Sequence, residues 1–242
     1  MQGDFFTKSA LRMYYFIGED KRYLRRLYEA LRDFDAYLWK YRDSDGDGCL
    51  ETWCTWDTGD DNNTRLLANE IYSTKYGAWC GETAPVGRGR LPFESAEYMA
   101  YSYSHRRTLA IISDILGNGE GDFWRGEAEK IRKKVREYLW DDEKKAVYDR
   151  DCDNEMLYTL TLENLKCMYH GLFYQDMADD LIRCHLLCRD EFFTPLPLPH
   201  LAANDPLVDV NDEYNNFTPE VAAKVREYMS GDALDNSWSG PV

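Results

Sequence analysis

The sequence is short of positive charge. It contains 29 Lys and Arg against 44 Asp and Glu, which gives a formal net charge of −15. Nucleic-acid binding needs a basic surface that neutralises phosphates, and anionic membrane surfaces attract basic segments in the same way. The composition therefore argues against nucleic acid and against a membrane as partners, although the acidity by itself indicates only solubility.

The sequence also lacks long apolar runs. No stretch could span a bilayer, and residues 1–20 show no basic start followed by an apolar segment, so no signal peptide is predicted. The seven cysteines are odd in number and loosely spaced, as is typical of reduced thiols in a cytoplasmic protein. Cys184 and Cys188 flank His185 on a predicted helix, and we interpret both as core residues rather than metal ligands.

Alternating patterns typical of strands are scarce, whereas apolar residues recur at intervals of three and four, the period of an amphipathic helix. We expect Phe123, Ile131, Val135 and Leu139 on one inner face, and Thr161 as an N-cap. The predicted helices span 5–17, 20–41, 65–72, 93–116, 121–139, 161–170, 173–189 and 218–231, with a turn or small hairpin within 140–154 and irregular chain at 77–92 and 190–216. The expected fold is all-α, built from antiparallel helix hairpins with long loops on one face.

Residues 42–51, RDSDGDGCLE, form the first half of an acidic loop. Oxygen ligands at every second residue let a tight loop wrap a hard cation such as calcium. The opening matches an EF-hand loop, but its closing Glu is replaced by Cys54. A shorter site would use Asp43, Asp45, Asp47, the Cys49 carbonyl and Glu51. A solvated acidic turn explains the same residues, and residue types alone leave the two open.

The second half of the loop, WDTGDDN at 56–62, places carboxylates beside an indole ring. Aromatic rings bind the apolar faces of sugars, and glycoside cleavage needs a carboxylic acid and an opposing carboxylate. A turn cluster before the next helix is the alternative, and residue types alone favour it slightly.

Four segments in order resemble the catalytic (α/α)6 barrel of glycoside hydrolase family 63, mannosylglycerate hydrolases and trehalases. RDSDGDG at 42–48 resembles the family's RDxDGDG loop, and WDTGDDN at 56–62 resembles W-E-S-G-x-D-N, with Asp57 in place of Glu and Thr58 in place of Ser. WDDE at 140–143 with Tyr148 and Asp149 resembles the "LWD…YYD" segment. NSWSGPV at 236–242 resembles N-x-W-x-G-P-V/I-W. Together the four span most of the chain.

The resemblance implies roles for individual residues. Asp61 matches the general acid, and Asp60 occupies the variable position beside it. Substrate binding is implied for Trp56, Asp60, Asn62 and Trp238. A calcium site is implied for the acids of the first half of the loop, with Glu94, on the predicted helix 93–116, as a further ligand. The substrate implied is an oligosaccharide or small glycoside, an α-glucoside or α-mannoside cleaved with inversion.

The sequence departs from the family in one respect. The family's catalytic base is a Glu beyond the N-x-W-x-G-P segment, and this chain ends inside that segment. We therefore expect a single domain over 1–242 that is a partial (α/α)6 barrel, lacking N-terminal and C-terminal helices. The open edges of such a barrel predict self-association or a complementing fragment. Two other functions stay open: an inactive, calcium-dependent carbohydrate-binding or interaction module, and a plain calcium-binding helical domain.

Overall fold

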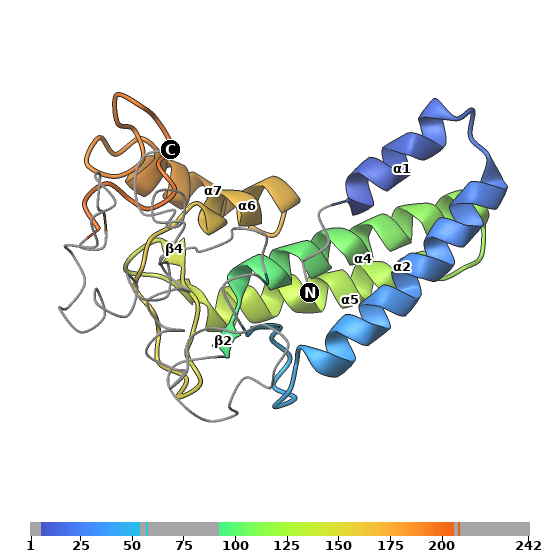
Figure 1. Cartoon of the computed structure of the whole chain (residues 1–242), viewed down its shortest axis with the longest axis horizontal. Helices are drawn as coiled ribbons and strands as arrows, with labels where there is room; N and C mark the ends of the chain where they lie inside the picture. Colours follow the sequence, from blue (N-terminus) through green and yellow to red (C-terminus); the bar gives the residue numbers. More distant parts are fainter. Residues whose placement is uncertain (1–5, 54–56, 58–91, 206–207, 209–242) are drawn as a thin grey trace, which may run out of the picture.

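The computed structural model describes residues 6–53, 57, 92–205 and 208, and these form a mainly helical unit (Figure 1). Two pairs of short strands connect the helices. The helices are α1 (Thr7–Phe16), α2 (Lys21–Tyr41), α4 (Ala96–Leu116), α5 (Gly121–Tyr138), α6 (Glu163–His170) and α7 (Gln175–Leu181), which continues into the π-helix η1 (Ile182–Leu186). The strands are β1 (Glu51–Thr52), β2 (Phe93–Glu94), β3 (Trp140–Asp141) and β4 (Ala146–Val147).

The predicted helical hairpin at the start of the chain is confirmed. Gly18 adopts a φ of +78° between α1 and α2, a conformation in which glycine has no steric penalty. Asp20 caps α2, because its carboxylate accepts a hydrogen bond of 2.8 Å from the Arg22 amide. Leu24, Leu31 and Leu38 are buried on one face of α2, as their spacing predicts.

Helix α4 is the central element. It contacts α1, α2, α5 and α6, and most of its residues from Ala96 to Ile112 are buried. Ser95 caps its start by accepting a hydrogen bond of 3.3 Å from the Tyr98 amide. Gly117 ends it in the left-handed conformation, as predicted. The helix does not begin at Phe93 as predicted, because Phe93 and Glu94 pair as a strand with β1.

Helix α5 packs along α4 after a short connection, and its predicted inner face needs one correction. Phe123 is 58% exposed, whereas Trp124 is buried and donates a hydrogen bond of 2.6 Å to the Tyr28 hydroxyl. The buried face therefore runs through Trp124, Ala128, Ile131 and Val135, at spacings of four, three and four. Two apolar clusters result, one around Leu109 and Trp124 and one around Leu50 and Met99.

The strands position the loops at one end of α4. Strand β1 pairs antiparallel with β2, so that Glu51 lies opposite Glu94, and residue 94 also bridges to Arg150. The hairpin predicted within 140–154 is confirmed as β3 and β4. Strand β2 therefore lies between the acidic loop and residues 149–150.

The region from 161 to 189 is helical, with three corrections. Thr161 does not cap α6: Leu162 holds that position without a side-chain cap, and Thr161 bridges to Leu201 instead. The predicted helix 173–189 is α7 followed by η1 and ends at Leu186. Cys184 is exposed and Cys188 half-buried, so neither is a core residue.

Within the described part of the chain, no helix is long and apolar enough to cross a membrane. The helices predicted at 65–72 and 218–231, and the irregular segment 77–92 except for its last residue, lie outside the described residues.

Candidate metal site and catalytic loop

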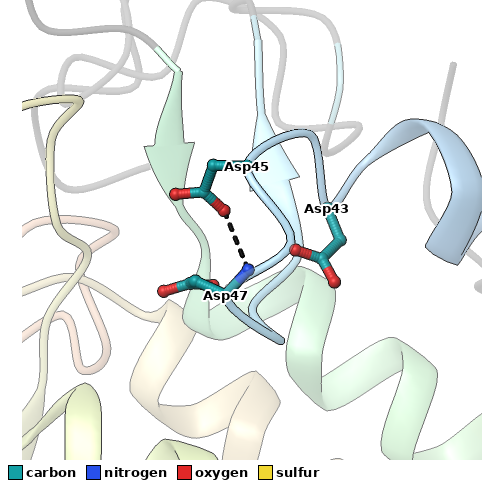
Figure 2. Close-up of side chains that lie close together, drawn as sticks. All are labelled: Asp43, Asp45 and Asp47. Carbon is teal, nitrogen blue, oxygen red and sulfur yellow. Dashed lines mark hydrogen bonds between the residues drawn. The ribbon is translucent and has the colours of Figure 1, made fainter.

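The acidic loop leaves the C-terminal end of α2 and folds back on itself through two glycines. Gly46 and Gly48 have φ values of +75° and +86°, which favour glycine at both positions. The Asp45 carboxylate accepts a hydrogen bond of 3.1 Å from the Asp47 amide, and Asp47 accepts one of 2.8 Å from the Cys49 amide. These turns hold the side chains on a tight curve, and Figure 2 shows three of them gathered around it.

The structure brings the predicted acidic ligands together in two overlapping groups. Carboxylate oxygens of Asp43, Asp45 and Asp47 lie within 4.8 Å of one another, as do those of Asp45, Glu51 and Glu94. Asp45 belongs to both groups. Glu94 reaches the loop from β2, not from the predicted helix, because Glu51 and Glu94 are register partners. The five carboxylates therefore form two groups of three that share Asp45.

Two of these carboxylates are buried. Glu51 accepts hydrogen bonds of 2.7 Å from the Ser44 hydroxyl and 3.0 Å from the Trp53 indole N–H, and it is 1% exposed. Glu94 is 7% exposed, and its Oε2 has no hydrogen-bond partner among the described residues. A buried carboxylate oxygen without a partner carries a desolvation penalty that a bound cation would remove.

The charges of the cluster oppose one another. Burial raises the pKa of Glu94 to about 8, and the negative charges of Asp47, Asp45 and Glu51 act in the same direction. Burial likewise raises the pKa of Asp43 and that of Glu51. Lys134 of α5 offsets part of this repulsion through an ion pair of 3.0 Å with Asp47. The excess of negative charge therefore suits a cation of higher charge than the Lys134 ammonium, such as a divalent metal ion.

Cys49 differs from the acids around it. Its side chain is fully buried in the cluster around Leu50, and burial raises the pKa of its thiol well above the usual value. The thiol belongs to neither group of metal-ligating side chains. The predicted ligand was the Cys49 carbonyl, and that role stays a prediction.

The second half of the loop is fixed at Asp57, which is 1% exposed. Its carboxylate accepts two hydrogen bonds from the Arg42 guanidinium, of 2.6 and 2.9 Å, and one of 2.8 Å from the Trp53 amide. Its carbonyl accepts one of 2.8 Å from the Tyr98 hydroxyl of α4. Burial alone would lower the pKa of Arg42, but the charge of Asp57 raises it. No sequence pattern indicates this ion pair, although Arg42 is the first residue of RDSDGDG and Asp57 is the second residue of WDTGDDN.

The segment that ends at Asp149, which also resembles the family, contacts the same end of α4. The Asp149 carboxylate accepts a hydrogen bond of 3.0 Å from the Ala96 amide in the first turn of α4, where a negative charge is favoured. The backbones of Glu94 and Arg150 exchange two hydrogen bonds, of 2.8 and 3.2 Å. Segments more than forty residues apart therefore converge beside Glu94.

The remaining predicted site residues lie outside the described residues. They are the general acid Asp61 and the substrate-binding candidates Trp56, Asp60, Asn62 and Trp238. Their roles stay predictions. One further polar contact joins α4 to α6: Lys166 lies 2.8 Å from the fully buried Glu97, a pair that no sequence motif indicates.

Comparison with known families decides the classification. Residues 4–242 match the mannosylglycerate hydrolase MGH1-like glycoside hydrolase domain. The chain belongs to this family. No curated protein sequence matches it.

Solved structures agree with this family at the level of the fold. The family 63 mannosylglycerate hydrolase of Thermus thermophilus in complex with glucose has a TM-score of 0.65 and 16% identity, covering 90% of this chain and 60% of that one. The same enzyme in complex with Tris gives 0.65 and 14%, covering 90% and 62%. A structure described as a sialidase gives 0.54 and 13%, covering 87% and 18%.

The fold is therefore that of the (α/α)6-barrel glycosidases, present as a partial toroid. The chain spans 60–62% of the length of the two mannosylglycerate hydrolase structures, which fits the predicted incomplete barrel.

Proposed function

We propose that this chain supplies the acid half of an inverting glycoside hydrolase that cleaves an α-glucoside or α-mannoside. Asp61 protonates the leaving oxygen. The opposing carboxylate, which in the family is a late Glu, activates water on the opposite face of the sugar. The substrate is a small glycoside or oligosaccharide, whose ring packs against Trp56 and Trp238.

The observation that supports this proposal is the anchoring of Asp57. This residue is the second of the segment WDTGDDN, and its side chain accepts three hydrogen bonds, two from Arg42 and one from the Trp53 amide. A general acid must stay within hydrogen-bonding reach of the leaving oxygen, so the loop that carries it needs a rigid anchor. We propose that Asp57 is this anchor, four residues before Asp61.

The charge of the loop also suits the chemistry. A general acid works best when its proton is retained near neutral pH, and neighbouring carboxylates raise the pKa of one another. Asp60 precedes Asp61 directly in the sequence. We propose that Asp60 binds a sugar hydroxyl beside the general acid.

The test is hydrolysis of aryl α-glucosides and α-mannosides by the full chain, alone and mixed with a fragment that carries the remaining barrel helices. Asp61→Asn should lower kcat by at least about 100-fold, because it removes the proton donor. Glu29→Gln, at an exposed position of α2 away from the acidic loop, is the matched control. Equal rates for wild type and Asp61→Asn would reject the acid assignment. Saturable glycoside binding without hydrolysis, both by the chain alone and by the mixture with the fragment, would favour the carbohydrate-binding alternative.

We further propose that the acidic loop binds calcium. The residues suit this ion: Asp43, Asp45, Asp47, Glu51 and Glu94 offer carboxylate oxygens, the ligands that calcium prefers, in two groups that share Asp45. The partnerless Oε2 of Glu94 is the observation that favours a cation over a solvated turn, because an exposed turn would leave no buried oxygen without a partner. A bound ion would fix the loop that leads through Trp53 to Asp57.

Calcium binding predicts a change in thermal stability. Calcium in large excess over Kd should raise the Tm of wild type by roughly 5–10 °C. Asp45→Ala should lose this gain, because Asp45 belongs to both carboxylate groups. Glu29→Ala, at the exposed acid of α2, should keep it. An equal rise in Asp45→Ala, or no rise in wild type, would contradict the site.

A further inference from the structure

A cavity of about 630 Å³ lies on the flank of α4, between α1 and the end of α6. Its position separates it from the acidic loop. Ser104, Arg107 and Ile111 line it, and they follow Ser95 by nine to sixteen residues, which places them about 14–24 Å along the helix axis. It is therefore a second site, distinct from the carboxylates beside Glu94.

The lining of this cavity is basic although the protein is strongly acidic. Lys8, Arg12, Arg107 and Arg132 contribute to it, and its described lining contains no Asp or Glu. A volume of this size is common among cavities that bind small molecules. The local charge is opposite in sign to that of the chain, whose net charge is −15.

Two of these cations have no counter-charge within the part of the chain that the structure describes. Arg12 and Arg107 are exposed, and neither has an ion pair or hydrogen bond to another described residue. Lys8 and Arg12 stand one turn apart on α1, an arrangement of like charges that destabilises a helix. Burial lowers the pKa of Lys8, and the charge of Arg12 lowers it further. A contact with Tyr169 offsets part of this repulsion on the side of Lys8, and an anion bound beside Arg12 would reduce it further.

The other two cations are held in place. Lys8 donates a hydrogen bond of 3.0 Å to the Tyr169 carbonyl, near the end of α6. Arg132 donates hydrogen bonds of 2.7 Å to the Gly171 carbonyl and 3.1 Å to that of Leu172. Glu129 lies 3.6 Å from Arg132 and neutralises part of its charge. These two side chains thus form fixed walls, while Arg12 and Arg107 are available to a ligand.

The base of the cavity is polar and its rim is apolar. Ser104 is 3% exposed and is one of the polar residues that line the cavity. Thr108 beside it donates its hydroxyl proton to the Ser104 carbonyl, at 2.9 Å. Tyr15 and Ile111 at the rim are 54% and 42% exposed. An anionic group with an organic substituent matches this arrangement of charge, hydroxyl and ring.

We infer that this cavity is a binding site for a small organic phosphate monoester. One guanidinium group can donate two parallel hydrogen bonds to two oxygens of a phosphate, and charge-assisted hydrogen bonds of this kind are about twice as strong as neutral ones. The phosphate contacts Arg12, Arg107 and the Ser104 hydroxyl. The organic substituent lies against Tyr15 and Ile111, because a phosphate alone would leave most of the volume empty.

The test is calorimetric titration of the full chain with glucose 6-phosphate and with inorganic phosphate. Both should bind saturably, and the organic phosphate more tightly. The double variant Arg12→Gln/Arg107→Gln should weaken binding roughly tenfold or more, since each exposed guanidinium supplies charge-assisted hydrogen bonds. Arg26→Gln is the matched control, because Arg26 is exposed, has no described partner and lies on α2 away from the cavity. Far-UV circular dichroism verifies that each variant is folded.

Three outcomes would overturn the inference: no saturable binding by wild type, equal binding by the double variant, or the same heat from sodium chloride at matched ionic strength. None of these readouts uses a glycoside, so failure here is distinguishable from failure of the proposed hydrolase activity.

Discussion

The carboxylate of Asp57 is the residue on which the candidate catalytic loop depends. It is buried and paired with the Arg42 guanidinium through two short hydrogen bonds. Taking both charges out of water is costly, and only this geometry, with the added Trp53 amide, offsets the penalty. Removing one charge alone would leave the other buried and uncompensated. A site that needs a fixed loop therefore gains rigidity from an interaction that adds little net stability.

Asp57→Asn should destabilise the protein by about 3 kcal/mol, because it leaves the Arg42 guanidinium without a counter-charge while keeping the side-chain volume. Urea unfolding at neutral pH measures the change. The matched control is Asp33→Asn, since Asp33 pairs with Arg32 at 3.2 Å on the surface, where both side chains are well exposed. The control should cost under about 1 kcal/mol. Equal costs in the two variants would show that the buried pair is not special.

At the scale of elements, helices with a clear apolar period could be predicted from the sequence, and their boundaries depended on glycine. Gly18 and Gly117 end α1 and α4 where the sequence places them, because both positions need a positive φ. The period of α2 also predicted its buried face. These features are local, and local sequence determines them.

The failures at this scale come from contacts that local sequence does not contain. Glu94 fits a helical pattern, but pairing with Glu51, which lies more than forty residues away, holds it in a strand. Thr161 is a good N-cap residue, yet a bridge to Leu201 occupies it. Phe123 was a different kind of error: Trp124, Ala128 and Ile131 already showed the correct spacing in the sequence.

At the scale of the whole molecule, the candidate metal site is assembled from parts of the chain that only the fold unites. The acids of residues 43–51 could be predicted as a group, because they are neighbours in the sequence. The family resemblance added Glu94 as a further ligand, but its burial in a strand beside these acids could not be predicted, since it requires β1 and β2 to pair before α4 begins. The same fold gathers positive charge on the opposite part of α4, in a chain with a net charge of −15.

The buried carboxylates give the calcium-free protein a stability that falls as pH rises. The pKa of Glu94 is raised from 4.5 to about 8, so the folded state retains a proton that the unfolded state has lost between these values. The contribution of Glu94 to the free energy of unfolding is then fully present below about pH 4.5 and decreases towards pH 8, by on the order of 2–4 kcal/mol.

Unfolding in urea with a chelator, from pH 5 to pH 8, measures this dependence of stability on pH. Glu94→Gln should flatten it, because the amide keeps the volume without titrating. Glu29→Gln, at an exposed position, should keep the wild-type slope. If stability falls with pH equally in wild type and in Glu94→Gln, the pH dependence does not come from the Glu94 carboxylate.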